Sequence, residues 1–345
     1  MIWGGHYYPI IPSPKVAVDI FILISGFIIT YIYYEKLKCN YSIKSLLEYA
    51  IKRFFRIAPL YYFILILTIF ISDEFLEGYK VLQSFEPNKW ESFIYNTDRI
   101  EFDMLNYILH FTFLFGLHPR YSFSTFLPDW SLSLEMQFYF LFPFLLFTLR
   151  KSLIISSIIL FIFSYISIEY INKIYYFYEP SFIGLKINIF FTGIIIGLFF
   201  NNNNKFFTQL LLLLIGIPFA MRFQIPQNYG SFFIPTIYIS LLVYFKFLKG
   251  YLLNFDNFLS CNILINYLSK LSYSVYLIHG FIISLFGIFL RNYAFFKDLT
   301  SQDRTHFLII FTLVPTYFLS FFSYKYIECN FIRLGNNIVN RIKNY

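Results

Sequence analysis

A carboxylate inside an apolar segment and a histidine near the start of the chain are the residues best suited to acid–base chemistry. Glu135 lies in segment 128–139, PDWSLSLEMQFY, at the head of an apolar stretch. An ionisable group inside an apolar segment that spans a membrane is costly, so its presence indicates a function. His6 is its candidate partner, because both segments are predicted on the same side of the membrane. A histidine beside a carboxylate can take a proton from an attacking hydroxyl group. A lone histidine near a terminus, however, is more often without a catalytic role.

Two arginines have the spacing needed to hold a phosphorylated ligand. Arg53 and Arg56 are three residues apart, so they share a face of a predicted helix. Guanidinium groups bind phosphate through paired hydrogen bonds. Taken alone, the pair is explained at least as well by basic residues anchoring the inner end of a membrane helix.

Two further ionisable residues lie in apolar segments, and each has two interpretations. Asp19 precedes the apolar run IFILISGF, where it could serve the site or only complement the positive end of a helix dipole. His279 falls in the middle of a predicted helix, where a structural hydrogen bond explains it as well as chemistry does.

The elements that carry these residues are predicted to be membrane-spanning helices. The 345 residues are 58% hydrophobic and only 13% charged, with a mean hydropathy of +0.61. Soluble domains average about 25% charged residues, so this chain has too few charged side chains to cover the surface of a soluble protein. Apolar stretches of about 18 or more residues recur along the chain, and continuous runs of that length favour helices over a barrel. We predict an all-α, polytopic bundle of about nine spans, at 17–35, 54–72, 131–149, 152–170, 183–200, 207–222, 231–248, 270–290 and 305–326.

The distribution of charge predicts the topology of the bundle. The loop after the first span is rich in lysine and arginine and is predicted to be cytoplasmic. The acidic region 73–130 is then an external loop, in which the apolar piece 104–117 is interfacial or re-entrant. Residues 327–345 form a cytoplasmic tail. The net charge of +8 therefore reflects a basic inner face rather than nucleic-acid binding.

Nothing in the sequence predicts an appended domain or a bound metal. We find no internal repeat, and no pair among the three cysteines has metal-ligand spacing. Residues 1–345 are predicted to form one integral membrane domain with no bound cofactor.

Four stretches together resemble the membrane-bound acyltransferase-3 family, which O-acylates cell-surface polysaccharides and some small molecules. In chain order they are VDIF through SGF at 18–27, KRFFRI with PLYY at 52–62, WSLSLE with QFY at 130–139, and LSYSVYL with histidine at 271–279. The closing YIE at 326–328 is also similar to the family's last helix. Any one stretch is weak, but their order over nearly the whole chain is specific.

The resemblance implies a bundle of about ten spans, of which residues 1–16 would be the remnant of the first helix and its loop. It implies that His6 is the family's histidine, and that the family's upstream arginine has no counterpart here. Acyl-CoA, with acetyl-CoA as the expected form, is the implied donor substrate. The implied substrate-binding residues are Asp19, Arg53, Arg56, Trp130, Ser131, Tyr139, Tyr273 and His279, beside the catalytic pair His6 and Glu135.

The function implied is transfer of an acyl group from acyl-CoA to a hydroxyl of a cell-surface or lipid-linked saccharide. The protein would be multi-pass, and in the plasma membrane if the source is bacterial. Two alternatives stay open. One is a non-catalytic carrier or scaffold for a lipid-linked sugar, and the other is an inactive, truncated family member.

Overall fold

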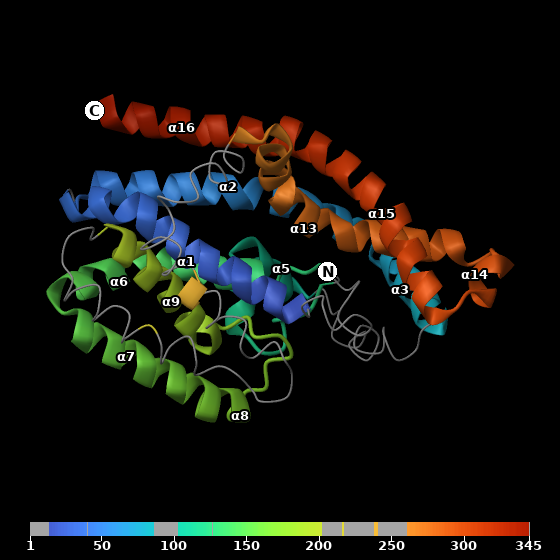
Figure 1. Ribbon diagram of the computed structural model, residues 1–345, viewed down its shortest axis with the longest axis horizontal. Helices are drawn as coiled ribbons and strands as arrows, with labels where there is room; N and C mark the ends of the chain where they lie inside the picture. The colour runs from blue at the N-terminus through green and yellow to red at the C-terminus, as the bar shows by residue number, and fades with distance from the viewer. Residues whose placement is uncertain are drawn as a thin grey trace. The chain divides into compact units, whose positions relative to one another are not determined.

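The computed structural model describes residues 14–39, 41–85, 103–125, 127–201, 216, 238–240 and 261–344 (Figure 1). Within these ranges the regular secondary structure is helical throughout and no strand is present, which confirms the all-α prediction. The chain divides into two compact units. The first comprises residues 1–47 and 131–259, and the second comprises residues 48–130 and 260–345.

Seven helices in the described part of the chain are long and apolar enough to cross a membrane. They confirm seven of the nine predicted spans, whereas the predicted spans 207–222 and 231–248 fall outside the described residues. The seven are Val16–Tyr34, Ile43–Phe70, Trp130–Lys151, Leu153–Ile174, Ile183–Phe200, Ile263–Leu290 and Ser301–Asn344.

The first unit is built on two helices packed along each other, α1 (Pro14–Cys39) and α9 (Ile183–Asn201). Glycines make this close packing possible. A methyl group added at Gly26 would collide with the Phe190 carbonyl oxygen, and one at Gly193 with the Leu23 carbonyl oxygen. Small residues let transmembrane helices bring their backbones together in this way. Stacking of Phe138 of α6 (Trp130–Lys151) on Phe190 joins a third helix to the unit.

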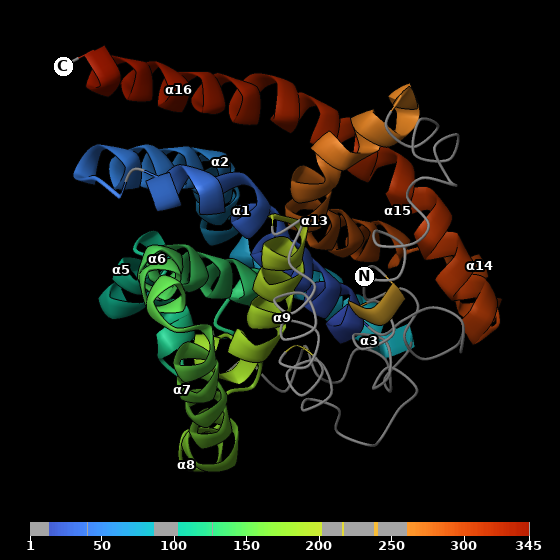
Figure 2. The same ribbon diagram turned by 60° about the vertical axis from the view of Figure 1, so that its left-hand side comes forward.

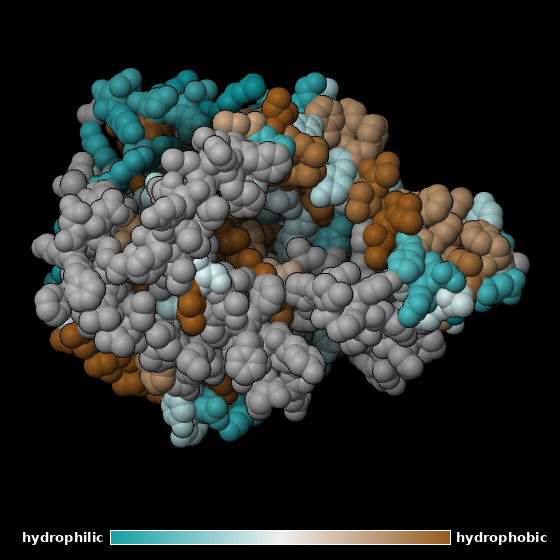
Figure 3. Space-filling view, viewed as in Figure 1, coloured by the Kyte–Doolittle hydropathy of each residue, from teal (hydrophilic) through white to brown (hydrophobic). Residues whose placement is uncertain are grey.

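Helix α7 (Leu153–Ile166) continues through the π-helical turn η3 (Ser167–Ile171) into α8 (Asn172–Ile174). The α7 face turned away from α9 carries the exposed isoleucines Ile154, Ile155, Ile158, Ile159 and Ile162. Figure 3 shows this apolar surface in brown along the edge formed by α7. A contiguous apolar face of this kind fits contact with lipid rather than water.

The second unit packs α13 (Ile263–Leu290) against α3 (Ser72–Phe85) and α15 (Ser301–Ser323), as Figure 2 shows. Two hydrogen bonds from hydroxyl groups connect α3 to α13. The Tyr79 hydroxyl of α3 donates to the Gly280 carbonyl at 3.1 Å, and the Ser284 hydroxyl of α13 donates to the Phe75 carbonyl at 2.7 Å. The short helix α14 (Ala294–Asp298) links α13 to α15. Region 73–130, predicted as a loop, therefore contains a packed helix.

The apolar piece 104–117 does not form a continuous helix. Helix α5 (Met104–Phe111) is capped by the Asp103 side chain, and the 3-10 turn η2 (Phe115–Leu117) follows. Between them the chain turns at Phe113, whose φ is 61°. Eight residues of helix span about 12 Å, far less than the roughly 30 Å hydrocarbon core. This geometry agrees with the prediction that the piece does not cross the membrane.

The last span is longer than predicted. Helix α15 runs through the π-helical turn η6 (Tyr324–Glu328) into α16 (Cys329–Asn344), and Figure 1 shows them as one extended rod. Residues 301–344 span about 66 Å as a helix, so the polar α16 extends beyond the hydrocarbon core. It packs on α2 (Ile43–Phe70), where Gly335 lies against Phe55 and Lys343 pairs with Glu48 at 2.9 Å.

Candidate functional site

Glu135 is a buried carboxylate held by hydroxyl groups in the first unit. Its side chain on α6 is only 4% exposed. The Ser25 hydroxyl of α1 donates to Glu135 Oε1 at 3.2 Å, and the Tyr139 hydroxyl donates to the same oxygen from one turn further along α6. Buried carboxylates need such partners, because losing hydration without compensation is costly. The structure thus brings together two predicted site residues, Glu135 and Tyr139, and adds Ser25.

Asp19 forms an ion pair that the sequence analysis did not anticipate. Lys186 Nζ, in the first turn of α9, lies 2.6 Å from Asp19 Oδ1 in α1, and both side chains are less than one-fifth exposed. A cation near the positive end of a helix dipole is unfavourable by itself. The nearby carboxylate offsets this cost, so the pair joins α1 to α9 next to the close glycine contacts.

The beginning of α6 is fixed to the beginning of α9 by an amide. Gln137 donates to the Ser181 carbonyl at 2.9 Å and accepts from the Ile183 backbone N–H at 3.0 Å. The predicted residues Trp130 and Ser131 open α6, with exposed fractions of 7% and 1%.

In the second unit, Arg56 is engaged by a buried carboxylate. Arg56 Nη1 lies 3.0 Å from Glu328 Oε2, and the Ser274 hydroxyl donates to Glu328 Oε1. The Glu328 side chain is 1% exposed, whereas the Arg56 side chain is 35% exposed. Arg53 lies one turn earlier on α2, half-buried. The predicted residue Tyr273 reaches the same helix, because its hydroxyl donates to the Ile57 carbonyl at 2.7 Å.

The ring of His279 is bound to its own helix. Its Nδ1 lies 2.7 Å from the Tyr276 carbonyl, and the side chain is 7% exposed. This geometry matches the structural interpretation of His279. Tyr276, on the same helix, donates its hydroxyl to the Pro128 carbonyl just before α6.

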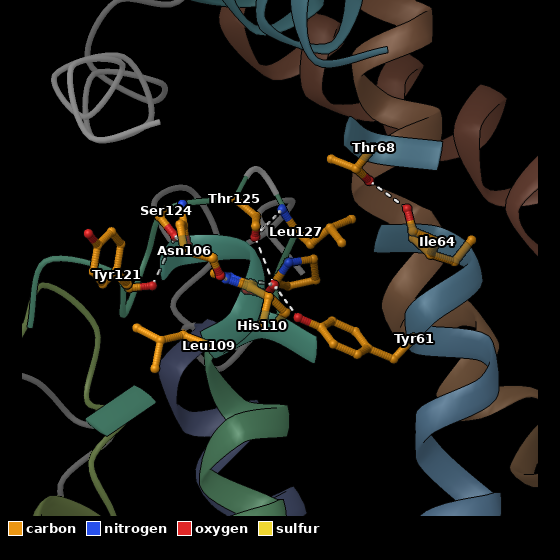
Figure 4. Close-up of polar contacts among 12 residues, drawn as sticks. Tyr61, Ile64, Thr68, Asn106, Leu109, His110, Tyr121, Ser124, Thr125 and Leu127 are labelled. Atoms are coloured by element: carbon orange, nitrogen blue, oxygen red, sulfur yellow. Dashed lines mark hydrogen bonds and ion pairs between the residues drawn. The ribbon is translucent and has the colours of Figure 1, made fainter. Parts of the chain in front are cut away.

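A buried polar cluster in region 103–130 was not predicted. The Asp129 Oδ2 atom accepts from Thr125 at 2.8 Å and from the Tyr61 hydroxyl at 3.2 Å, and His110 Nε2 lies 3.7 Å from it (Figure 4). The His110 ring stacks on Phe115, with ring centroids 4.1 Å apart. Both side chains are at most 3% exposed, and His110 Nε2 and Asp129 Oδ1 have no hydrogen-bond partner.

The pair His110 and Asp129 holds one titratable proton in the folded protein, in addition to the N–H that a neutral histidine always carries. The Asn106 carbonyl lies 3.0 Å from His110 Nδ1 and can only accept, so Nδ1 carries a proton. Burial lowers the pKa of His110 to about 4 and raises that of Asp129 to about 7, despite the hydrogen bonds that Thr125 and Tyr61 donate to Asp129. Between these values the folded pair is uncharged, with neutral His110 beside protonated Asp129.

The proton count predicts opposite pH dependences for two variants. Between about pH 4 and 6.5 the unfolded pair also holds one proton, on histidine, so the pair leaves wild-type stability nearly independent of pH there. In Asp129→Asn only the unfolded state binds a proton, so the free energy of unfolding rises with pH. In His110→Gln only the folded state binds a proton, on Asp129, so the free energy of unfolding falls as the pH rises. Each slope is at most about 1.4 kcal/mol per pH unit.

Thermal unfolding in detergent between pH 4.5 and 6.5 measures these slopes, taken as differences from wild type so that other groups cancel. Curves for both variants that stay parallel to the wild-type curve would show that His110 and Asp129 keep their ordinary pKa values.

The predicted site residues divide between the two units. Asp19, Ser131, Glu135 and Tyr139 lie in the first, and Arg53, Arg56, Trp130, Tyr273 and His279 lie in the second. His6 lies outside the described residues, so its pairing with Glu135 stays a prediction. Lys186 was missed, although it is a lone lysine in an apolar span and ionisable residues at membrane depth are informative. Asp129 was counted only among the acidic residues of region 73–130, and His110 was not singled out.

Long apolar helices that hold buried carboxylates, hydroxyls and ion pairs define this chain as a multi-pass membrane protein with a polar interior. Its particular family follows from comparison with known families. Residues 3–325 match the acyltransferase-3 family, described as an acyltransferase domain, and the chain belongs to this family. No curated protein and no solved structure matches the chain.

Proposed function

We propose that the protein is a membrane O-acyltransferase that moves an acyl group, in the simplest case acetyl, from acyl-CoA to a hydroxyl of a cell-surface or lipid-linked saccharide. Membership of the acyltransferase-3 family carries the proposal. In a bacterial cell the protein would reside in the plasma membrane. The buried Glu135 supports the acid–base part of the reaction, and the arginines of α2 support the donor.

The donor's phosphates are assigned to α2. Arg53 and Arg56 lie on one face of the helix, and Arg56 keeps about a third of its side chain exposed while Glu328 holds its Nη1 atom. A planar guanidinium has five N–H donors, so one carboxylate contact leaves others for a phosphate.

The transfer itself requires removal of one proton. The acceptor oxygen attacks the thioester carbonyl, a carbon–oxygen bond forms, and the carbon–sulfur bond breaks. His6 takes the hydroxyl proton, which then passes to the thiolate of CoA. Glu135 supports the positive charge that develops on His6, because Asp19 is already paired with Lys186. Trp130, Ser131 and Tyr139 would line the acceptor side.

The test is acyl transfer by the purified protein. With labelled acetyl-CoA and an envelope glycan, we expect label on the glycan and release of free CoA thiol, and we expect His6→Ala to abolish both while the protein stays folded. His306→Ala, at an exposed histidine on α15, is the matched control.

Three outcomes are separable. Near-normal transfer by His6→Ala removes His6 from the mechanism but leaves the enzyme. Glycan binding without any acyl transfer in the wild-type protein would favour a carrier or scaffold. Absence of both would favour an inactive family member.

A further inference from the structure

Glu328 is a buried carboxylate at an irregularity in its helix. The residue ends the π-helical turn η6, in which an extra residue is accommodated between α15 and α16. Such turns are rare and frequently lie at functional sites. The Glu328 side chain is 1% exposed, whereas that of Tyr326, two residues earlier, is 58% exposed, so the turn has one buried and one exposed face.

Each oxygen of this carboxylate is bound from a different helix. Ser274 of α13 donates to Oε1, and Arg56 of α2 donates to Oε2 at 3.0 Å. Three segments distant in the sequence therefore meet at one buried carboxylate. The Tyr273 hydroxyl, bound to the Ile57 carbonyl at 2.7 Å, fixes the α2 backbone next to Arg56.

The two members of the ion pair differ in exposure, and only Arg56 is accessible to a ligand. Glu328 is shielded from any ligand, whereas the Arg56 side chain is 35% exposed. Here the buried carboxylate binds Nη1 of a long, flexible cation whose side chain is 35% exposed, and the guanidinium has further N–H donors beyond the one that Glu328 accepts from.

We propose that Glu328 is a positioning residue that orders the Arg56 guanidinium to bind a phosphate of the acyl donor, with Ser274 orienting the carboxylate. The inference rests on the proposed function. It does not make Glu328 a catalytic residue, because no reacting atom touches it. Ordering a side chain before binding lowers the entropy lost when the ligand binds.

The test compares two donors, acetyl-CoA and acetyl-pantetheine, because the second carries no phosphate. In Glu328→Ala we expect the KM for acetyl-CoA to rise roughly tenfold, the size of one charge-assisted hydrogen bond. We expect kcat to be nearly unchanged and the KM for acetyl-pantetheine to stay at the wild-type value. Glu328→Gln should restore most of the affinity, because its amide oxygen can still accept from Arg56.

Two further variants secure the test. Ser274→Ala leaves the charge of Glu328 but removes the orienting hydrogen bond, so it should raise the KM for acetyl-CoA by a smaller factor even if Glu328→Ala fails to fold. Glu77→Gln is the matched control, because it breaks the exposed pair of Glu77 with Arg291 in the same unit.

The proposal is overturned if Glu328→Ala and Ser274→Ala leave the KM for acetyl-CoA unchanged, or if the KM rises equally for both donors, which would indicate a general structural role. A fall in KM would show instead that Glu328 competes with the phosphate for Arg56. A wild-type protein that transfers no acetyl group would refute the proposed function, and this inference with it.

Discussion

Replacing Glu135 with glutamine is expected to lower kcat by roughly 10²- to 10⁴-fold, the range that a positioned acid–base group contributes. The amide keeps the shape of the side chain, and its oxygen can still accept from Ser25 and Tyr139. The substitution therefore removes the charge that we propose supports His6, while the packing around α6 is preserved. Initial rates of CoA release at saturating acetyl-CoA measure the effect.

Glu169→Gln is the control for this experiment. It makes the same chemical change at a partly exposed carboxylate of the same unit, whose partner is Lys173 four residues later. Its kcat should match that of the wild type. If Glu135→Gln were as active as Glu169→Gln, the buried carboxylate would be part of the helix packing alone, and support for the base would have to come from elsewhere.

Among the variants proposed here, Gly193→Ala is expected to lower the free energy of unfolding the most. The added methyl would meet the Leu23 carbonyl oxygen and lie 3.1 Å from the Gly26 Cα atom. These obstacles are backbone atoms of α1, so no side-chain rotation relieves them and the two helices must separate. Overpacking costs about 1–3 kcal/mol even where neighbours can adjust, and separation would also strain the Asp19–Lys186 pair. The melting temperature in detergent should fall by several degrees or more.

Gly280→Ala provides the comparison. Both positions are in long helices, so both substitutions gain a similar helix propensity, up to about 1 kcal/mol. At Gly280 the nearest obstacle is the Tyr79 hydroxyl at 3.3 Å, which is the far end of a side chain and not backbone. This variant should keep a melting temperature close to that of the wild type. Equal melting temperatures for the two variants would show that α1 and α9 do not pack through their backbones.

The start of α2 illustrates the limits of hydropathy as a guide to helix ends. The predicted span began at residue 54, where the apolar run begins, but the helix begins at Ile43. Residues 43–53 contain four charged side chains and lack the composition of a span. They are helical in a context supplied by α16, which places Lys343 against Glu48 and Gly335 against Phe55. Contacts with a segment almost 300 positions away are invisible to a local window.

By itself, the sequence determined the class of this protein and its family. Runs of about 18 or more apolar residues must become helices in lipid, because each backbone polar group has to find its partner within the segment. That requirement is local, so composition and the length of the apolar runs predicted seven spans that the structure confirms. The motifs around Arg56 and Glu135 are local as well, and they identified the acyltransferase-3 family.

Only the tertiary structure decided which charges are paired. Asp19 meets Lys186 across 167 positions, and Arg56 meets Glu328 across 272. His110 and Asp129 meet because the chain turns at Phe113 and returns before α6. A carboxylate in an apolar run signals that a partner exists, since an isolated buried charge is too costly. Which residue is that partner depends on helix packing and on irregular turns such as η6, and neither is encoded in the spacing of residues along one segment.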